Sequence, residues 1–254
     1  VMTALYDTDV PVPKTFGYCD DETVIGTPFF IMDHVVGNIY WELLLPGCDP
    51  NQRREIYLSM NDTIAKLHNV DFDKVNLADY GKHENYMDRQ IHRWTKQYKD
   101  SETQMIPEIN ELIEWLPKNI PSDQETSIVH GDFRLDNMIF DPITHEVKAI
   151  LDWELSTLGN PIADFTYHMM SWRLPAGAKG LGMMGSDLKS LNIPSESEYA
   201  ELYYKKTGRE KIDNWDFYMA YNIFRLAGIA QGIVGRVRDG TASSSEAKNY
   251  EAFV

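Results

Sequence analysis

The feature that most constrains this chain is a polar loop followed by a pair of short apolar runs. Asp132 and Asn137 lie five residues apart in the run HGDFRLDN, residues 130–137. Residues 138–151 then hold two apolar runs joined by a turn-forming stretch, which predicts two short strands connected by a turn. Asp152 follows the second run directly. Three oxygen-bearing side chains are therefore expected around one hairpin.

The rest of the chain has mainly helical patterns. Apolar residues recur at helical spacing in several segments, which are residues 51–68, 87–98, 106–116, 162–172, 196–206 and 213–238. The short apolar run Phe29–Met32 instead predicts a strand, and the connection that follows it contains Gly37. The sequence therefore predicts an α+β fold in which a small β portion precedes a mostly helical remainder.

The polar residues around the hairpin suit phosphoryl transfer. In that reaction one carboxylate takes the proton of the attacking hydroxyl, and an amide and a carboxylate hold Mg²⁺ on the phosphates. The spacing from Asp132 to Asn137 equals that in the protein-kinase catalytic loop HRDxxxxN. Taken alone, Asp132 would be interpreted as a turn residue and Asn137 as a strand-end cap. Asp152 follows at an interval from Asp132 that also matches the kinase pattern, which favours the catalytic interpretation of both residues.

Residues 130–137 resemble the loop of the aminoglycoside phosphotransferase and choline kinase superfamily. The continuation ILDWELSTLGNPIADF, residues 150–165, is similar to a kinase-like region that occurs alone in many bacteria and fused to acyl-CoA dehydrogenases in eukaryotes. The resemblance covers most of the chain. It implies a protein-kinase-like fold, with a truncated small β lobe and hinge at residues 1–37 and a mostly helical catalytic lobe at residues 38–254. The active site would lie between these lobes.

The resemblance also implies roles for individual residues, carried over position by position. Asp132 would be the base, and Asn137 and Asp152 would bind Mg²⁺. Backbone atoms near Asp33 and Val35, in the segment that resembles the family's hinge, would contact the adenine of ATP.

Further residues would support the loop. The resemblance implies that Asp164 holds the catalytic loop from the following helix and that His130 shapes the loop rather than titrating. Two interpretations of Arg134 stay open, namely a solvated loop charge or a guanidinium that approaches a phosphate. Trp153 and Glu154 stand where a protein kinase has Phe-Gly. The protein-kinase style of activation switching is therefore not expected.

The part of the chain before Phe29 departs from the family's pattern. A complete kinase of this type begins with a glycine-rich loop over the phosphates and a strand lysine that pairs with a helix glutamate. Only 28 residues precede Phe29, Gly17 and Gly26 stand alone, and Lys14 lies on a proline-containing connector. We therefore expect a fragment of a longer kinase, which by itself would phosphorylate poorly or not at all. A catalytically inert, kinase-derived binding module is the alternative function.

Charge and composition narrow the class of partner. The net charge of −15 argues against a binder of duplex nucleic acid, because such a protein needs a basic face to neutralise phosphates. No stretch approaches the roughly 18 apolar residues that span a membrane. Cys19 and Cys48 form no CxxC pattern, which argues against a zinc site or a disulfide framework. A cytoplasmic protein is expected.

The acceptor of the phosphoryl group stays open between two classes of small molecule. The acyl-CoA dehydrogenase-linked branch suggests a hydroxyacyl-CoA or a similar hydroxylated acid, and an association with acyl-CoA metabolism. Residues 201–238 contain seven basic and four acidic side chains, which would suit such an anionic acceptor. The acidity of the whole chain would instead suit a cationic aminoglycoside or an amino alcohol.

Overall fold

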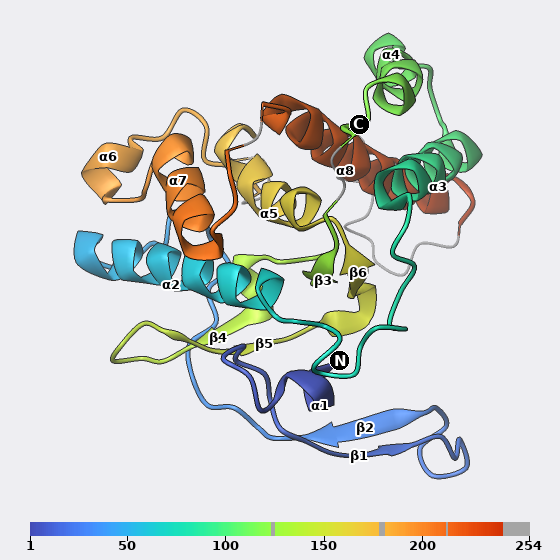
Figure 1. Cartoon of the computed structure of the whole chain (residues 1–254). Helices are drawn as coiled ribbons and strands as arrows, with labels where there is room; N and C mark the ends of the chain where they lie inside the picture. The colour runs from blue at the N-terminus through green and yellow to red at the C-terminus, as the bar shows by residue number, and fades with distance from the viewer. Residues whose placement is uncertain (123–124, 178–180, 212, 241–254) are drawn as a thin grey trace. The chain divides into compact units, whose positions relative to one another are not determined.

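The computed structural model describes residues 1–122, 125–177, 181–211 and 213–240 (Figure 1). The chain forms two compact units. The first unit contains residues 1–81 and 127–211, and the second contains residues 82–126 and 212–254. All the candidate site residues belong to the first unit. The lobe boundary expected at residue 37 stays a prediction.

Short antiparallel strand pairs make up the β structure of the described residues. Three pairs occur, all in the first unit: β1 (Thr15–Cys19) with β2 (Phe29–Met32), β3 (Ser127–Val129) with β6 (Thr157–Gly159), and β4 (Met138–Phe140) with β5 (Val147–Ile150). The predicted strand at residues 29–32 and the predicted hairpin after residue 137 are confirmed. The catalytic loop that the sequence predicts therefore connects β3 to β4.

The β1–β2 hairpin exposes a large share of its apolar side chains. Phe16, Tyr18, Phe30 and Ile31 each expose more than half of their surface. Strand β2 was predicted, whereas β1 was not, because the sequence indicated a proline-containing connector before Phe29. The prolines before residue 14 lack backbone N–H groups, but the ladder begins only after them, so they do not interrupt it.

Helix α2 (Pro50–His68) begins with a complete capping box. The Asp49 carboxylate accepts hydrogen bonds from the N–H groups of Asn51 and Gln52, at 2.8 and 3.0 Å. The Gln52 side chain accepts the N–H of Asp49 in return, at 2.9 Å. These bonds satisfy donors that have no partner within the helix, and they place the start of α2 at the predicted residues.

The other helices of the first unit vary in length. They are α1 (Met2–Leu5), α5 (Pro161–Met169), α6 (Leu188–Leu191) and α7 (Glu196–Thr207), with a 3-10 turn at Met170–Trp172. The turn explains why one helix was predicted over residues 162–172. Figure 1 shows α7 beside α2. The rings of Phe165 on α5 and Tyr203 on α7 stack, with centroids 3.9 Å apart and planes 11° from parallel, so buried aromatic contacts fix α5 in place.

The second unit is helical in its described residues. It contains α3 (Tyr86–Ser101), α4 (Pro107–Trp115) with a 3-10 turn at Leu116–Lys118, and α8 (Trp215–Arg238). The predicted core face of α3 is buried as expected. A Cβ atom added at Gly235 of α8 would lie 2.9 Å from the Cβ atom of Ser101, so this glycine permits close packing of α8 on α3. No helix in the described parts of the chain is long and apolar enough to cross a membrane.

Candidate active site

The predicted catalytic loop runs from the end of β3 to the start of β4. Its second residue, Gly131, has a φ of +84°, and a Cβ atom added there would lie 2.7 Å from the carbonyl oxygen of Leu155. A side chain would therefore meet both backbone strain and a steric conflict, which explains the glycine. The loop closes with a 3-10 turn at Leu135–Asn137, directly before β4. This turn places Asn137 at the root of the hairpin.

Asp164 on α5 holds the backbone of this loop. Its Oδ2 atom accepts the N–H of His130 and its Oδ1 atom accepts the N–H of Gly131, both at 2.8 Å. Burial alone would raise the pKa of Asp164, but the hydrogen bond and charge interaction with His68, together with interactions at His130, hold this pKa below its ordinary value. The buried carboxylate thus stays ionised and fixes the start of the loop.

The His130 side chain connects the loop to the end of β5. Its Nδ1 atom accepts the N–H of Asp132 at 3.2 Å, so in the neutral ring the proton lies on Nε2. Nε2 then donates to the carbonyl oxygen of Leu151 at 2.9 Å. Both ring nitrogens therefore act within the loop structure, and His130 joins the residues around Asp132 to those around Asp152.

The Asp132 carboxylate receives a donor on each of its oxygens. The hydroxyl of Tyr167 donates to Oδ1 at 2.7 Å, and Nδ2 of Asn137 donates to Oδ2 at 3.1 Å. The same amide group also donates to the backbone carbonyl of Asp132, at 2.9 Å. The structure therefore brings two of the predicted site residues, Asp132 and Asn137, into direct contact.

Asp152 lies at the same end of the hairpin as Asn137. The N–H of Leu151 donates to the carbonyl oxygen of Asn137 at 2.8 Å, and Asp152 is the next residue. It is exposed and adopts the left-handed conformation, with φ 64° and ψ 58°. This conformation is uncommon outside glycine, although aspartate tolerates it better than most residues, and such residues cluster at functional sites.

Arg134 binds to the carboxylates of the loop itself. Its Nε atom donates to Oδ1 of Asp136 at 3.1 Å, Nη2 contacts the other oxygen of Asp136, and Nε lies 3.7 Å from Oδ1 of Asp132. Burial would lower the pKa of Arg134, but the neighbouring Asp132 and Asp136 carboxylates raise it above its ordinary value. In the structure the Arg134 guanidinium is therefore paired with carboxylates of its own loop.

The predicted hinge residues Asp33 and Val35 directly follow β2. The N–H of Asp33 extends the β1–β2 ladder by donating to the carbonyl oxygen of Lys14 at 2.8 Å. Asn38 then forms a bridge to Phe140 of β4, with both N–H···O distances at 2.8 Å. A Cβ atom at Gly37 would lie 2.4 Å from the Phe140 carbonyl oxygen, so glycine is needed at this crossing. The hinge therefore leads to the strand that follows the catalytic loop.

Sequence reasoning missed Tyr167 and the bond from His68 to Asp164. Tyr167 lies three residues after Asp164 on α5, so the two side chains leave the helix on the same face, and this spacing was the available signal. His68 was not among the candidate site residues that the sequence suggested. It is buried at the end of α2, and it also bonds to Asp164.

Potential metal ligands in the described part of the chain are few. No three His, Cys, Asp or Glu side chains gather there in an arrangement that could hold a metal ion. The predicted pair, Asn137 and Asp152, offers one amide and one carboxylate. Mg²⁺ is commonly held by one or two protein carboxylates together with phosphate and water oxygens, so a sparse set of hard oxygen donors fits this ion.

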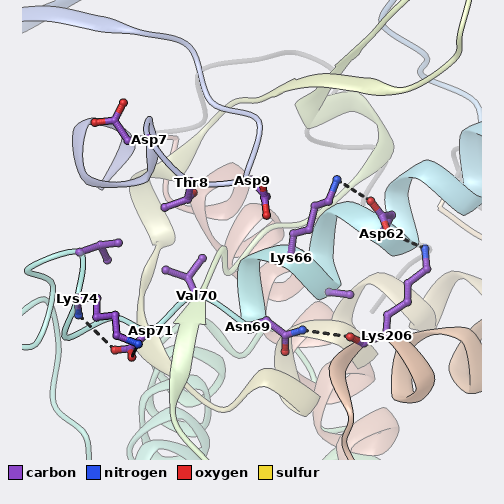
Figure 2. Close-up of a pocket in the computed structure, with 12 residues that line it drawn as sticks. Asp7, Thr8, Asp9, Asp62, Lys66, Asn69, Val70, Asp71, Lys74 and Lys206 are labelled. Atoms are coloured by element: carbon purple, nitrogen blue, oxygen red, sulfur yellow. Dashed lines mark hydrogen bonds and ion pairs between the residues drawn. The ribbon is translucent and has the colours of Figure 1, made fainter.

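A separate cavity of about 550 Å³ lies in the first unit, and none of the predicted site residues lines it. Figure 2 shows that its lysines already have partners. Lys66 and Lys206 both contact Asp62, at 2.8 and 3.1 Å, and Lys74 contacts Asp71 at 2.8 Å. The cations of this cavity are thus neutralised by neighbouring carboxylates, and nothing marks it as the reaction centre.

Comparisons with known proteins identify the family of this chain. The sequence profile of the phosphotransferase enzyme family (APH) matches residues 1–201. Acyl-CoA dehydrogenase family member 10 of Mus musculus is 45% identical over 249 residues, which are 98% of this chain and 23% of that protein. Family member 11 of Homo sapiens is 41% identical over 248 residues, 97% of this chain and 32% of that protein. The chain thus spans only a quarter to a third of these relatives.

Solved structures show the same fold. A provisionally assigned aminoglycoside phosphotransferase from Ralstonia eutropha JMP134 is 51% identical, with a TM-score of 0.94 over 99% of this chain and 77% of that one. An aminoglycoside phosphotransferase in complex with GDP and kanamycin is 13% identical, with a TM-score of 0.65 over 98% of this chain and 77% of that one, and it supports the fold alone. The protein-kinase-like fold is therefore confirmed. The chain belongs to the phosphotransferase enzyme family.

Proposed function

We propose that this protein is a kinase that transfers the γ-phosphoryl group of ATP to a hydroxyl group of a small metabolite. The single observation that carries the proposal is the hydrogen bond between Asn137 and Asp132, in a loop whose backbone is held by the buried Asp164. Phosphoryl transfer depends mainly on positioning and charge neutralisation, and this loop supplies a positioned carboxylate beside an amide. Membership of a phosphotransferase family supports the same reaction class.

In the proposed reaction Asp132 is the base. The oxygen of the acceptor hydroxyl bonds to the γ-phosphorus while the bond from this phosphorus to the oxygen bridging the β- and γ-phosphates breaks, so that ADP leaves. The hydroxyl proton passes to the Asp132 carboxylate. A positioned base of this kind contributes a factor of roughly 10² to 10⁴ to the rate.

Asn137 and Asp152 would hold Mg²⁺. Because the amide nitrogen of Asn137 donates to Asp132, the amide oxygen is the end left for a cation. Asp152 adds an exposed carboxylate at the same end of the hairpin. When bound, the ion would neutralise charge on the phosphates.

The nucleotide would lie against the segment after β2. Two distantly related phosphotransferases have been solved with GDP and with ADP, which supports a nucleotide as the phosphoryl donor here. Because the N–H of Asp33 already donates to Lys14, we assign the adenine contacts to the carbonyl oxygen of Asp33 and the N–H of Val35. The pairing of Arg134 with Asp136 leaves this arginine as a support of the loop rather than a phosphate ligand.

The acceptor that we favour is a hydroxylated acyl thioester or a related acid. The relatives with 45% and 41% identity are named as acyl-CoA dehydrogenase family members, which points to acyl-CoA chemistry in the longer proteins. A panel of acceptors would contain 3-hydroxyacyl-CoA thioesters, aminoglycosides and amino alcohols.

The test combines binding with turnover, on the full natural protein and its Asp132→Asn variant. Mg-ATP at about a hundred times its Kd should stabilise either form by about 2.7 kcal/mol, measured as a rise in Tm. Phosphoryl transfer to a member of the acceptor panel, followed as ADP release with radiolabelled product, should occur only in the unmodified protein.

Two results would contradict the proposal. Absence of any thermal shift with Mg-ATP would favour a catalytically inert binding module. Unchanged turnover in Asp132→Asn would exclude Asp132 as the base, whatever the acceptor.

A further inference from the structure

Tyr167 contacts the side chain of Asp132, the proposed base, whereas Asp164 on the same helix holds the backbone of the loop. The Tyr167 hydroxyl donates to Oδ1 of Asp132 at 2.7 Å, and only 4% of the residue is exposed. Asp164, three residues earlier on the same helix, accepts the N–H groups of His130 and Gly131. One face of α5 therefore fixes both the path of the loop and the direction of the carboxylate.

The two donors on Asp132 restrict how its carboxylate can turn. Tyr167 donates to Oδ1 and Asn137 donates to Oδ2. A rotation of the carboxylate about its bond to Cβ would therefore break both hydrogen bonds. A carboxylate has about four lone-pair sites, so two donors leave sites on which a proton can be received. The carboxylate is thus held in one orientation without losing its capacity to act as a base.

The packing and the N-terminal cap of α5 hold the Tyr167 hydroxyl in place. Phe165, two residues before Tyr167, stacks on Tyr203 of α7 with planes 11° from parallel. Asn160 caps the start of α5 by accepting the N–H of Ala163 at 2.9 Å. A hydroxyl that donates to a carboxylate makes one of the stronger hydrogen bonds in proteins, at a typical length of about 2.5–2.7 Å. The observed length is at the upper end of that range.

We propose that Tyr167 is a positioning residue for phosphoryl transfer, whose hydroxyl orients the Asp132 carboxylate toward the acceptor hydroxyl. This inference rests on the proposed function. Positioning acts on the chemical step, because a misplaced reacting group can lower the rate about a hundredfold. Nucleotide affinity depends on other atoms and should not change with the hydroxyl. A residue that only packs in the core would instead affect stability, through its ring.

The experiment is the substitution Tyr167→Phe, which keeps the ring and removes the hydroxyl. We expect kcat to fall roughly ten- to a hundredfold while KM and Kd for Mg-ATP stay within about twofold. The matched control is Tyr57→Phe, which removes another buried hydroxyl, one that donates to the carbonyl oxygen of Leu43 at 2.7 Å. This control should leave kcat within about twofold, whatever its effect on Tm.

A kcat for Tyr167→Phe within about twofold of the unmodified protein would overturn the inference. A parallel loss of kcat, nucleotide affinity and Tm would overturn it too, because that pattern describes a structural role.

A second measurement does not depend on turnover. In a protein labelled with ¹³C at aspartate carboxyl carbons, the Asp132 signal, assigned by its loss in Asp132→Asn, should move in Tyr167→Phe and stay in place in Tyr57→Phe. An Asp132 signal that does not move in Tyr167→Phe would overturn the inference. Failure of the unmodified protein to transfer phosphate would count against the proposed function, and the carboxyl signal would still decide whether Tyr167 orients Asp132.

Discussion

Nε2 of His68 lies 3.2 Å from Oδ2 of Asp164, the same oxygen that accepts the N–H of His130. The other ring nitrogen of His68 lies 2.7 Å from the hydroxyl of Tyr203. Because His68 is the last residue of α2 and Tyr203 lies on α7, one buried carboxylate connects α2, α5 and α7 with the catalytic loop. The loop is therefore coupled to the helical core of the first unit.

Removing the histidine should weaken that core. The substitution His68→Leu leaves the buried Asp164 carboxylate with one donor fewer, and we expect the free energy of unfolding to fall by about 1–3 kcal/mol. Urea unfolding followed by circular dichroism measures this change. The control His92→Leu alters an exposed histidine and should change the free energy by no more than about 0.5 kcal/mol. Equal stability of the two variants would contradict the coupling.

Acid should destabilise the protein through His168. Burial lowers the pKa of His168 to about 4, whereas the ordinary value is 6.5. Between these values the unfolded chain binds more protons than the folded one, so the free energy of unfolding falls as the pH falls through this window, by about 3 kcal/mol in all. Urea unfolding at several pH values in this window measures the slope.

The variant His168→Gln keeps a polar group near the hydroxyl of Tyr199, which lies 2.9 Å from the His168 ring, but it cannot titrate. Its stability should therefore depend less steeply on pH between the two pKa values. Parallel curves for the variant and the unmodified protein would show that another group causes the slope.

Substituting glycine for Asp152 should preserve the stability of the protein but weaken its binding of Mg-ATP. Glycine adopts the left-handed conformation of this residue without the cost of about 1 kcal/mol that a side chain incurs, so Asp152→Gly should keep or slightly raise Tm. Because the carboxylate is lost, the rise in Tm caused by Mg-ATP should shrink strongly. Differential scanning fluorimetry with and without Mg-ATP measures both effects. An undiminished Mg-ATP shift would remove Asp152 from the proposed metal site.

The glycine of the catalytic loop should tolerate no side chain. For Gly131→Ala, the conflict with the Leu155 carbonyl oxygen adds to the cost of the positive φ, and we expect a loss of more than about 2 kcal/mol in the free energy of unfolding. Gly208→Ala is the matched control, because Gly208 also has a positive φ but open space around it. That substitution should cost about 1 kcal/mol. Similar losses in the two variants would contradict the steric argument.

The sequence predicted elements well where many residues repeat one pattern. Residues of α2 and α3 that face the core recur at helical spacing, and both helices lie where this spacing placed them. Strand β6 was missed because three residues cannot show a period and Gly159 ends the strand with a turn signal. Strand β1 was missed because neighbouring prolines indicated a connector. Its exposed side chains do not alternate with buried ones, so they gave no strand signal.

Among the contacts of the site, those between residues close in the sequence could be predicted from their spacing, whereas those between distant residues could not. The contact between Asp132 and Asn137 lies within one loop, where the interval of five residues already indicates proximity. The bond between His68 and Asp164 joins residues 96 positions apart. Periodicity and spacing carry no information about such a pair, because its proximity depends on how separate elements fold together. The same reason explains why the bond from Tyr167 to Asp132 went unpredicted.

The β4–β5 hairpin brings Asn137 and Asp152 to the same end, although they are fifteen residues apart in the sequence. Asn137 and Asp152 stand at its open end, whereas residues 141–146 form the turn at its closed end. Extra residues inserted into that turn would lengthen the interval between the two positions in the sequence and would leave both where they are. Related proteins can therefore vary this interval freely, and a search that demands a constant gap between the two residues would overlook members that share the same geometry.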